Sequence, residues 1–427
     1  MMKFNESKNL LNKALKIIPA QAQTFSKNWT QYPLGQAPIF SDKAEGGYVW
    51  DVDGNKFIDW PMALGPMILG HNNKEVNLAV IKRLKKGIAF SLPNKVELEL
   101  SEKLIDWFPY AEAIRFGKNG SDVTSAAVRA ARAYTKKNHI LCCGYHGWQD
   151  WFIGSTSRSG GVPNEVKKLT HPFIYNDIDS LIKLLHKFKG KVGAIIMEPM
   201  GLEYPKNNFL QKVRKLASEH NVVLIFDECW TGFRLHKMGS YGIFHVKPDI
   251  ACFGKALGNG IPISILLGNK DIMNVFEDIF FSFTFGGDVL GMTAADTVLN
   301  IIEKEPVISY IEEIGNKLNI GVKSIIKDLN ISKYVSYSGY SGRSAFSFSG
   351  DKNEGLLIKS IFQQESIKKG ILAAGWHAPC YAHTYKDIDK TLSTYHDVFK
   401  LISYSLEKDN LKTLLKGKMV QQVFRKL

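Results

Sequence analysis

The chain has 427 residues, of which 45% are hydrophobic and 11% aromatic, enough to bury the core of one large enzyme subunit. Its 55 basic and 41 acidic residues give a net charge of +14, but the basic residues are scattered along the chain, so we predict no nucleic-acid partner. No secretory signal opens the chain, no run reaches the roughly 18 apolar residues of a membrane span, and the five cysteines form no C-x-x-C pair. These features predict a cytoplasmic protein that makes no membrane contact.

The first seventy residues predict a helix, a polar loop and a hairpin. The opening residues are amphipathic and are followed by Pro19, which ends the helix. The segment GGYVWDVDGNKFIDW predicts two strands joined at Asp53-Gly54, a pair of residues typical of hairpin turns. A glycine-rich apolar stretch, PMALGPMILGHNN, then predicts either a core crossing or a pocket wall. Two helices follow, in NKEVNLAVIKRLKKG and VELELSEKLIDWF.

From about Ala113 the pattern alternates between strands and helices. The strand candidates are AIRFG, HILCCG, HPFIYND, VGAIIMEP, VVLIFDE, DIACFG and ISILLG. This alternation predicts an α/β fold with a seven-stranded, mostly parallel sheet, whose last pair of strands is close enough in sequence to be antiparallel. Long helices with a few strands follow beyond about Asn316. We therefore expect an N-terminal segment (1–70), a large domain (71–315) and a small C-terminal domain (316–427).

A glycine turn precedes the helix expected in SDVTSAAVRAARAYTKK. The free backbone amides and the dipole at the start of such a helix suit a phosphate, which Asn119, Gly120 and Ser121 would hold. The alternative is an ordinary helix cap made by Ser121 and Asp122. The residues downstream favour the phosphate interpretation.

Two further strand ends carry polar or aromatic residues. After HILCC, Tyr145 is a candidate to stack on a flat ring, and His146 to donate to that ring or to substrate; the alternative is an aromatic core corner. Glu198 ends the strand AIIM and points to the ligand side or caps a helix. Glu203 lies five residues further on.

The strongest signal comes from two neighbouring strand ends. Asp227 ends the apolar strand VVLIF, and Lys255 follows the strand DIACF, before a glycine-rich turn. In open α/β sheets ligands bind at the carboxyl ends of strands. A lysine that forms a Schiff base and a carboxylate that keeps a pyridine nitrogen protonated are the groups that pyridoxal phosphate requires. We therefore predict pyridoxal phosphate as the cofactor, with Lys255 and Asp227 as the catalytic residues.

The segment FSFTFGGDVLGMTAAD has the glycine spacing of a nucleotide-binding P-loop, but Met292 stands where the lysine should be, which excludes that interpretation. Thr284, before the paired glycines, remains a candidate phosphate donor. We find no metal-binding or dinucleotide-binding motif and predict no metal.

Assembled in order, these segments resemble the class III aminotransferases, in fold type I of the pyridoxal-phosphate enzymes, and look closest to glutamate-1-semialdehyde 2,1-aminomutase. The resemblance covers about residues 13–400. Its markers are YVWDVDGNKFIDW, LGPMILGH, NGSDVTSAAVRAARAYT, GYHG, GGVPNEVKKLT, IIMEP, LIFDECWTGFR, KPDIACFGKALGNGIP and TFGGD. It implies that Lys255 carries the cofactor and moves a proton, that the two termini form the smaller lobe, and that two copies form a homodimer with shared sites. In that dimer Thr284 would reach the phosphate of the partner subunit.

The chain departs from the aminomutase where substrate carboxylates are held. No arginine precedes Arg83 and none lies between Arg343 and Arg425, and lysine or histidine does not easily replace bidentate arginine recognition. We therefore predict amine transfer from an amino-acid donor to a polar carbonyl acceptor, such as a sugar or a phosphorylated ketone or aldehyde, with Glu203 and His377 near it. The alternatives are an intramolecular amine shift, as in the aminomutase, and a cofactor-binding regulator without turnover.

Overall fold

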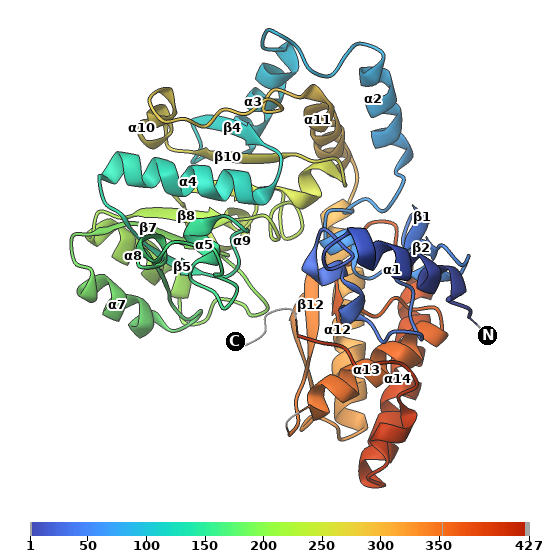
Figure 1. Cartoon of the computed structure of the whole chain (residues 1–427). Coiled ribbons are helices and arrows are strands. Elements are labelled where there is room, and N and C mark those ends of the chain that lie inside the picture. Colours follow the sequence, from blue (N-terminus) through green and yellow to red (C-terminus); the bar gives the residue numbers. More distant parts are fainter. Residues whose placement is uncertain (1, 352, 423–427) are drawn as a thin grey trace. The chain divides into compact units, whose positions relative to one another are not determined.

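The computed structural model describes residues 2–351 and 353–422. The chain divides into two compact units, which we describe separately: residues 2–73 with 309–422, and residues 74–308. Figure 1 shows the elements of both. We call them the terminal unit and the central unit.

The central unit is built around a seven-stranded sheet with the order β4-β10-β9-β8-β7-β5-β6. Its strands are β4 (Ala113–Gly117), β5 (His139–Cys143), β6 (Thr170–Pro172), β7 (Val192–Met197), β8 (Val223–Asp227), β9 (Ile250–Phe253) and β10 (Ser264–Gly268). Strands β5 to β9 pair in parallel, whereas β10 runs antiparallel to both β9 and β4. The predicted α/β class and the antiparallel final pair are confirmed.

Helices cover both faces of this sheet. They are α2 (Lys74–Leu84), α3 (Lys95–Trp107), α4 (Gly120–Thr135), α5 (Asp150–Ile153), α6 (Asn164–Lys167), α7 (Ile178–Lys187), α8 (Phe209–Glu219), α9 (Tyr241–Phe244), α10 (Lys270–Met273) and α11 (Val289–Lys304). The alanine-rich side of α4 packs on one face, in a core that includes Ile196 and Ile225. Helices α7 and α8 pack on the other face, against Ile195 and Leu224.

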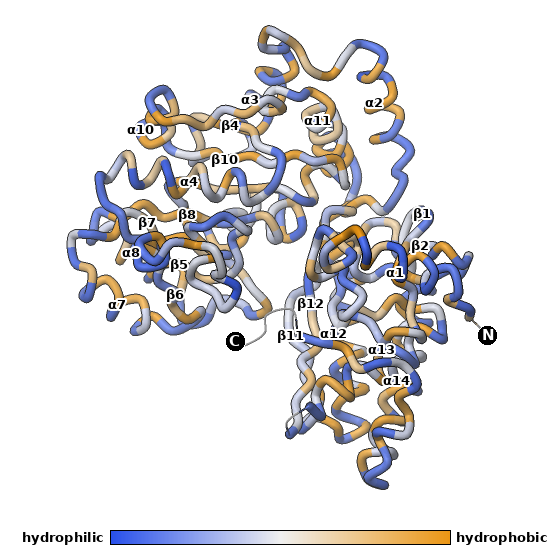
Figure 2. Tube along the Cα trace, in the orientation of Figure 1, coloured by the Kyte–Doolittle hydropathy of each residue, from blue (hydrophilic) through white to orange (hydrophobic). Residues whose placement is uncertain are grey.

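Strand alternation decides which face carries the polar end of β8. Successive side chains of a strand point to opposite faces. Ile225 belongs to the core beneath α4 and Phe226 to the core beneath α7 and α8, so Asp227 ends the strand on the α4 face. In Figure 2 the chain along β7 and β8 is mostly hydrophobic, so the carboxylate of Asp227 ends an otherwise apolar strand.

The terminal unit combines both ends of the chain. It contains α1 (Asn5–Ile17), β1 (Ser41–Glu45), β2 (Tyr48–Asp51), β3 (Lys56–Ile58), α12 (Val307–Asp328), β11 (Val335–Tyr340), β12 (Arg343–Phe348), α13 (Glu354–Lys368), β13 (Trp376–His377) and α14 (Tyr385–Glu407). The expected hairpin is β2–β3, and the exposed strand β1 pairs with β2 beside it. The core combines aliphatic and aromatic side chains, with Trp60, Phe362, Tyr395 and Phe399 fully buried. Among the described residues, no helix has both the length and the apolar character needed to cross a bilayer.

Candidate active site

A buried hydrogen-bonded pair marks the carboxyl end of the sheet. His146 Nδ1 donates to Asp227 Oδ2 over 2.8 Å, and both side chains are almost fully excluded from solvent. Burial by itself raises the pKa of Asp227, but the hydrogen bond and charge of His146, the charge of Lys255 and the N–H of Cys229 outweigh it, and the pKa lies below its ordinary value. The carboxylate is therefore held ionised at a place where burial alone would protonate it.

The start of α4 lies against the same end of the sheet. Asp122 accepts the Asn119 N–H over 2.7 Å, and the Asn119 carbonyl accepts from Ser264 Oγ over 2.8 Å. In the part of the chain that the structure describes, the N–H groups of Gly120 and Ser121 have no acceptor. A side chain at position 120 would collide with Cys229 Sγ, which its Cβ would approach to 2.7 Å. A 16-residue helix that leaves two amides open suits an anion.

The turn Gly144–Gly147 joins β5 to this region. Gly147 has φ +115°, and a Cβ there would come within 2.4 Å of the Ser121 Cβ, so only glycine lets this turn lie against the start of α4. Thr124 Oγ1 donates to the His146 carbonyl over 2.7 Å and fixes the same contact. The sequence therefore brings the turn, the helix start and Asp227 together.

Tyr145 is positioned within this turn by Glu198. Glu198 Oε1 accepts the Tyr145 N–H over 3.1 Å, so the carboxylate at the end of β7 orients the turn. The Tyr145 ring stands edge-on to Phe152, with 54% of the residue exposed. Its pKa is raised by partial burial and by the charge of Asp227. The ring is therefore near the carboxylate and accessible to a planar ligand.

Lys255 follows β9 after Gly254 and has φ 44°, a left-handed conformation that a side-chain-bearing residue adopts at a cost of about 1–3 kcal/mol. Its Nζ lies 4.4 Å from the centroid of the Trp230 ring. The charge of Lys255 is close enough to Asp227 to lower its pKa. Lys255 and Asp227, which follow neighbouring strands, therefore interact electrostatically.

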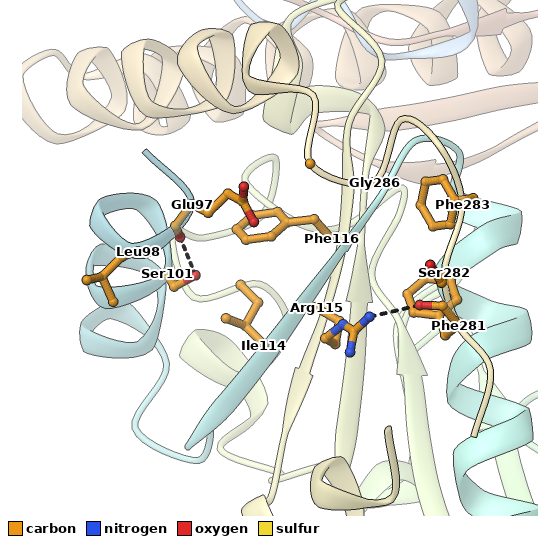
Figure 3. A pocket seen from close by; sticks show the side chains of 11 residues that line it. Glu97, Leu98, Ser101, Ile114, Arg115, Phe116, Phe281, Ser282, Phe283 and Gly286 are labelled. Carbon is orange, nitrogen blue, oxygen red and sulfur yellow. Dashed lines mark hydrogen bonds between the residues drawn. The ribbon is translucent and has the colours of Figure 1, made fainter. Parts of the chain in front are cut away.

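Thr284 lies in an exposed turn that precedes α11. Beside it is a cavity of about 390 Å³ between α3, β4 and residues 281–287 (Figure 3). Arg115 from β4 holds this loop by donating to the Phe281 carbonyl over 2.8 Å. Lys118, just before the start of α4, pairs with Asp288 at 2.5 Å, so the loop is tied to the helix start.

The two expected substrate residues have other surroundings. Glu203 is exposed and pairs with Lys206 over 2.8 Å, and hydrogen bonding and charge from Lys206 lower its pKa. His377 lies in the core of the terminal unit, where its two ring nitrogens are bonded to the Tyr337 and Tyr395 hydroxyls at 2.9 and 2.8 Å. Burial lowers the pKa of His377 to about 3. This environment favours a structural role for His377.

Sequence reasoning passed over two residues that adjoin the site. Trp230 is three residues after Asp227, and its ring faces Lys255. Its position just beyond the strand end that carries Asp227 was the feature of the sequence from which it could have been predicted as a site residue. Glu228 is buried, and burial, opposed by hydrogen bonds from Ser240 and Thr231, raises its pKa to about 7. The sequence places two acids next to each other, Asp227 and Glu228, and does not indicate which of them faces the ligand. The alternation of side chains along β8 does indicate it, because it places Asp227 on the α4 face of the sheet.

The donors and acceptors present fit pyridoxal phosphate. Asp227 offers an ionised carboxylate for a protonated ring nitrogen, and the open amides at the start of α4 suit a phosphate. His146 Nε2 is buried without a partner among the described residues, which leaves one polar atom available to a ligand. These features come from residues of the central unit alone.

The family described as Aminotransferase class-III matches residues 31–384, and the chain belongs to that family. A 3-aminobutyryl-CoA aminotransferase from Cloacimonas acidaminovorans is 33% identical over 409 residues, 93% of this chain and 97% of the relative. Glutamate-1-semialdehyde 2,1-aminomutase 2 from Lachnoclostridium phytofermentans is 32% identical over 431 residues, 93% and 100% of the two chains. The solved FumI protein of Sphingopyxis sp. MTA144, in its pyridoxal-phosphate internal aldimine form, superposes with a TM-score of 0.87 at 25% identity, covering 97% of this chain and 98% of its own.

The family, the fold type I architecture and the dependence on pyridoxal phosphate predicted from the sequence are confirmed by these matches. The chain is a pyridoxal-phosphate-dependent transaminase of class III.

Proposed function

We propose that this enzyme moves an amino group from an amino-acid donor to a carbonyl acceptor that presents no free carboxylate, with Lys255 and Asp227 as its catalytic residues. The observation that carries the proposal is the buried Asp227–His146 pair beside the charge of Lys255. Bound pyridoxal phosphate supplies an aldehyde that condenses with amines and a ring that takes up electrons. The ionised carboxylate of Asp227 would hold a proton on the ring nitrogen.

Lys255 has two roles in this proposal. Its Nζ would form the covalent link to the cofactor and, once released by the donor amine, would act as the general base. It would remove the proton from the α-carbon of the donor and, in the return half-reaction, deliver a proton to the carbon that receives the amine. The Trp230 ring, 4.4 Å from Nζ, would limit where the amine can swing.

The remaining residues of the site would bind and orient. Gly120 and Ser121 would donate their open amides to the phosphate, together with Asn119. Tyr145 would stack on the ring, held in place by Glu198. His146 would fix Asp227 through Nδ1 and offer Nε2 to the ligand.

The substrate proposal rests on the distribution of arginine. With no arginine before Arg83, the N-terminal loop has only Lys27 as a cation between residues 20 and 40. A single lysine lacks the planar fork that recognises a carboxylate bidentately. A keto-sugar or a phosphorylated ketone or aldehyde meets this condition, and Glu203 could accept from its hydroxyls. A 3-oxoacyl thioester also meets it, a class suggested by the relative named for 3-aminobutyryl-CoA.

The second candidate function is an intramolecular amine shift. It is favoured by the relatives named glutamate-1-semialdehyde 2,1-aminomutase, one of which is matched over 100% of its length. Such a reaction needs no external amino donor. The holoenzyme should therefore be incubated with each candidate acceptor and ¹⁵N-labelled glutamate or alanine, and separately with glutamate 1-semialdehyde, which carries both an amine and a carbonyl, without any donor; the products are measured by mass spectrometry. Transfer of the label to an acceptor supports transamination. Isomerisation of glutamate 1-semialdehyde without donor, together with no label in any acceptor, supports the shift and overturns the proposal.

We also propose that two copies form a homodimer with shared sites. The turn before α11 exposes three aromatic residues: Phe280 at 76%, Phe283 at 36% and Phe285 at 61%. Phe283 also lines the cavity of Figure 3, and the neighbouring Thr284 would donate to the phosphate bound by the partner subunit. Sedimentation of a Phe285→Asp variant should show dissociation, while Tyr404→Asp, which changes an exposed residue of α14, should not. A Phe285→Asp enzyme that stays dimeric contradicts this surface.

A cytoplasmic location is proposed as well, since all five cysteines are free thiols buried in the fold. Fractionation of cells that express the chain without a tag checks it; recovery outside the cytoplasm contradicts it.

A further inference from the structure

The segment that follows β8 carries an aromatic ring to the site and has a carboxylate inside it. Trp230 belongs to this segment, residues 228–240, and its ring centroid lies 4.4 Å from Lys255 Nζ. A cation within about 6 Å of an indole ring face is attracted to it. Glu228, at the start of the segment, is 1% exposed. Acidic side chains are almost never buried this deeply unless they are paired, so the partners of Glu228 indicate its role.

Three donors from the same segment bind the Glu228 carboxylate. Its Oε1 accepts the Ser240 N–H over 2.8 Å and also the Ser240 hydroxyl, and its Oε2 accepts the Thr231 hydroxyl. Thr231 and Ser240 are themselves buried. Hydrogen bonds to an ionised carboxylate are about twice as strong as those between neutral groups. The carboxylate therefore ties residue 231 to residue 240 and closes the segment into a loop.

The backbone of the segment is packed around the same carboxylate. Gly239 has φ +59°, and a Cβ there would come within 2.9 Å of the Glu228 carboxyl group. The Gly232 N–H donates to the Glu228 carbonyl over 2.7 Å, and the Glu228 N–H donates to the Cys252 carbonyl of β9 over 2.8 Å. Glu228 is therefore bonded to the sheet through its backbone and to both ends of the loop through its side chain.

The main chain is fixed on both sides of Trp230. The Cys229 N–H, on one side, donates to Asp227 Oδ1 over 3.1 Å. The Thr231 hydroxyl, on the other side, donates to Glu228. Two adjacent carboxylates therefore hold the two neighbours of the tryptophan, and through them the place from which the indole extends.

The buried charge of Glu228 is not explained by stability alone. Replacing a buried charged group by apolar side chains of the same shape is often neutral or even stabilising. Burial raises the pKa of Glu228 to about 7, so keeping this carboxylate ionised costs free energy of folding. A residue that carries such a cost has a local task, and the site residue that it anchors is Trp230.

We propose that Glu228 is a positioning residue, whose carboxylate holds the Trp230 ring against Lys255 through the Thr231 and Ser240 hydroxyls and so keeps the amine where it transfers the proton. The inference rests on the proposed function, in which Lys255 is the general base. Glu228 acts through the indole and not on the reacting atoms.

The first test uses the cofactor-free protein at pH 8, above the pKa of about 7 of Glu228. The chain has 8 tryptophans, so the fluorescence of Trp230 is obtained by subtracting the spectrum of the same protein with Trp230→Phe. Thr231→Val removes the hydroxyl with little change of shape, and Thr231→Ser keeps it. Acrylamide quenching of Trp230 should rise about twofold or more in Thr231→Val, because a released loop opens locally, and stay at the parent value in Thr231→Ser. Unchanged quenching in a folded Thr231→Val protein overturns the proposal.

The second test is a double-mutant cycle in the holoenzyme. Thr231→Val should lower kcat about fivefold with little change in KM, and less than about twofold when Trp230→Phe is already present, because residues that act through one another are not additive. An equal loss of kcat in both backgrounds overturns the proposal, since the hydroxyl then does not act through Trp230. The quenching test needs neither cofactor nor turnover. A Lys255→Ala protein that retains the borohydride-fixed cofactor would contradict the proposed function and leave the quenching result intact, so the two failures are distinguishable.

Two further variants complete the test. Ser240→Ala removes the other hydroxyl and should change quenching and kcat in the same direction as Thr231→Val. The matched control is Thr297→Val, in which a buried threonine of α11 loses a hydroxyl that donates to the Thr293 carbonyl over 2.8 Å; both measurements should equal those of the parent. Circular dichroism identifies any variant that fails to fold, and Ser240→Ala decides the question if Thr231→Val is one of them. A folded Ser240→Ala protein with the quenching and kcat of the parent shows that the carboxylate does not position Trp230.

Discussion

Replacing His146 with phenylalanine isolates the force that keeps Asp227 ionised. The phenylalanine ring can keep the contacts with Trp151 and Phe152 but removes the 2.8 Å hydrogen bond. Asp227 then retains only the Cys229 N–H and the charge of Lys255. Removing one partner of a buried hydrogen bond costs about 1–3 kcal/mol, and towards the upper end or more when the group left behind is charged. We expect the free energy of unfolding at pH 7.5 to fall by about that amount.

The pH dependence identifies the cause of this loss. In the parent, the low pKa of Asp227 adds stability above the unfolded value of 3.8, and this stability disappears as pH falls through the folded value. In the variant burial dominates, the folded pKa rises above 3.8, and protonation relieves the cost as pH falls. The deficit should therefore be large at pH 7.5 and shrink towards pH 4.5. Urea unfolding of the cofactor-free protein at both values measures it, with the exposed His186→Phe as control. A deficit that is the same at both pH values refutes the reasoning.

Three further predictions follow from the site. Glu228→Gln should flatten the decline in the free energy of unfolding between pH 4.5 and 7. A buried acid whose pKa is raised from 4.5 in the unfolded chain to about 7 in the folded protein lowers that free energy by about 3 kcal/mol as the pH rises through this interval. Identical urea midpoints for parent and variant at pH 5 and 8 would contradict this. Lys255→Ala should lower turnover by about 10²–10⁴-fold or more, and borohydride should no longer attach the cofactor covalently to the protein. The control Lys189→Ala, which changes an exposed lysine, should behave as the parent. If the Lys255→Ala protein still retains the borohydride-fixed cofactor, the assignment of Lys255 is wrong. Tyr145→Ala should weaken cofactor binding by about two- to tenfold and Tyr145→Phe hardly at all, since stacking contributes about 0.5–1.5 kcal/mol; equal affinities in a spectroscopic titration exclude stacking.

The sequence predicted those parts of the fold that carry a local signal. Apolar runs such as VVLIFD and DIACFG identify buried strands by themselves, and their polar ends indicated Asp227 and Lys255. Strand β1 was missed because its sequence, SDKAE, is polar and exposed, and only pairing with β2 makes it a strand. Strand β6 covers Thr170–Pro172, so only His171 and Pro172 of the predicted run HPFIYND form the strand, because proline cannot continue the ladder.

Long-range partners were beyond the reach of sequence patterns. His146 was predicted to meet the ring or the substrate, but its bond to Asp227 joins residues 81 apart and depends on the order of β5, β7 and β8 in the sheet. The enclosure of His377 by two tyrosine hydroxyls likewise depends on the packing of β11, β13 and α14. The motif WHAPCYAHT carries no sign of it.

The antiparallel strand β10 also constrains how the protein is made. Strand β4 is the first strand of the sheet to leave the ribosome, yet it lies at the edge, and its neighbour there is β10, with Ile114 opposite Leu267. Some 150 residues of chain must be synthesised before that edge can close, and loop closure over such a length is slow. Because β10 follows Lys255 in the chain, the edge strand β4, which leads into the start of α4, gains its neighbour in the sheet only after Lys255 has been synthesised.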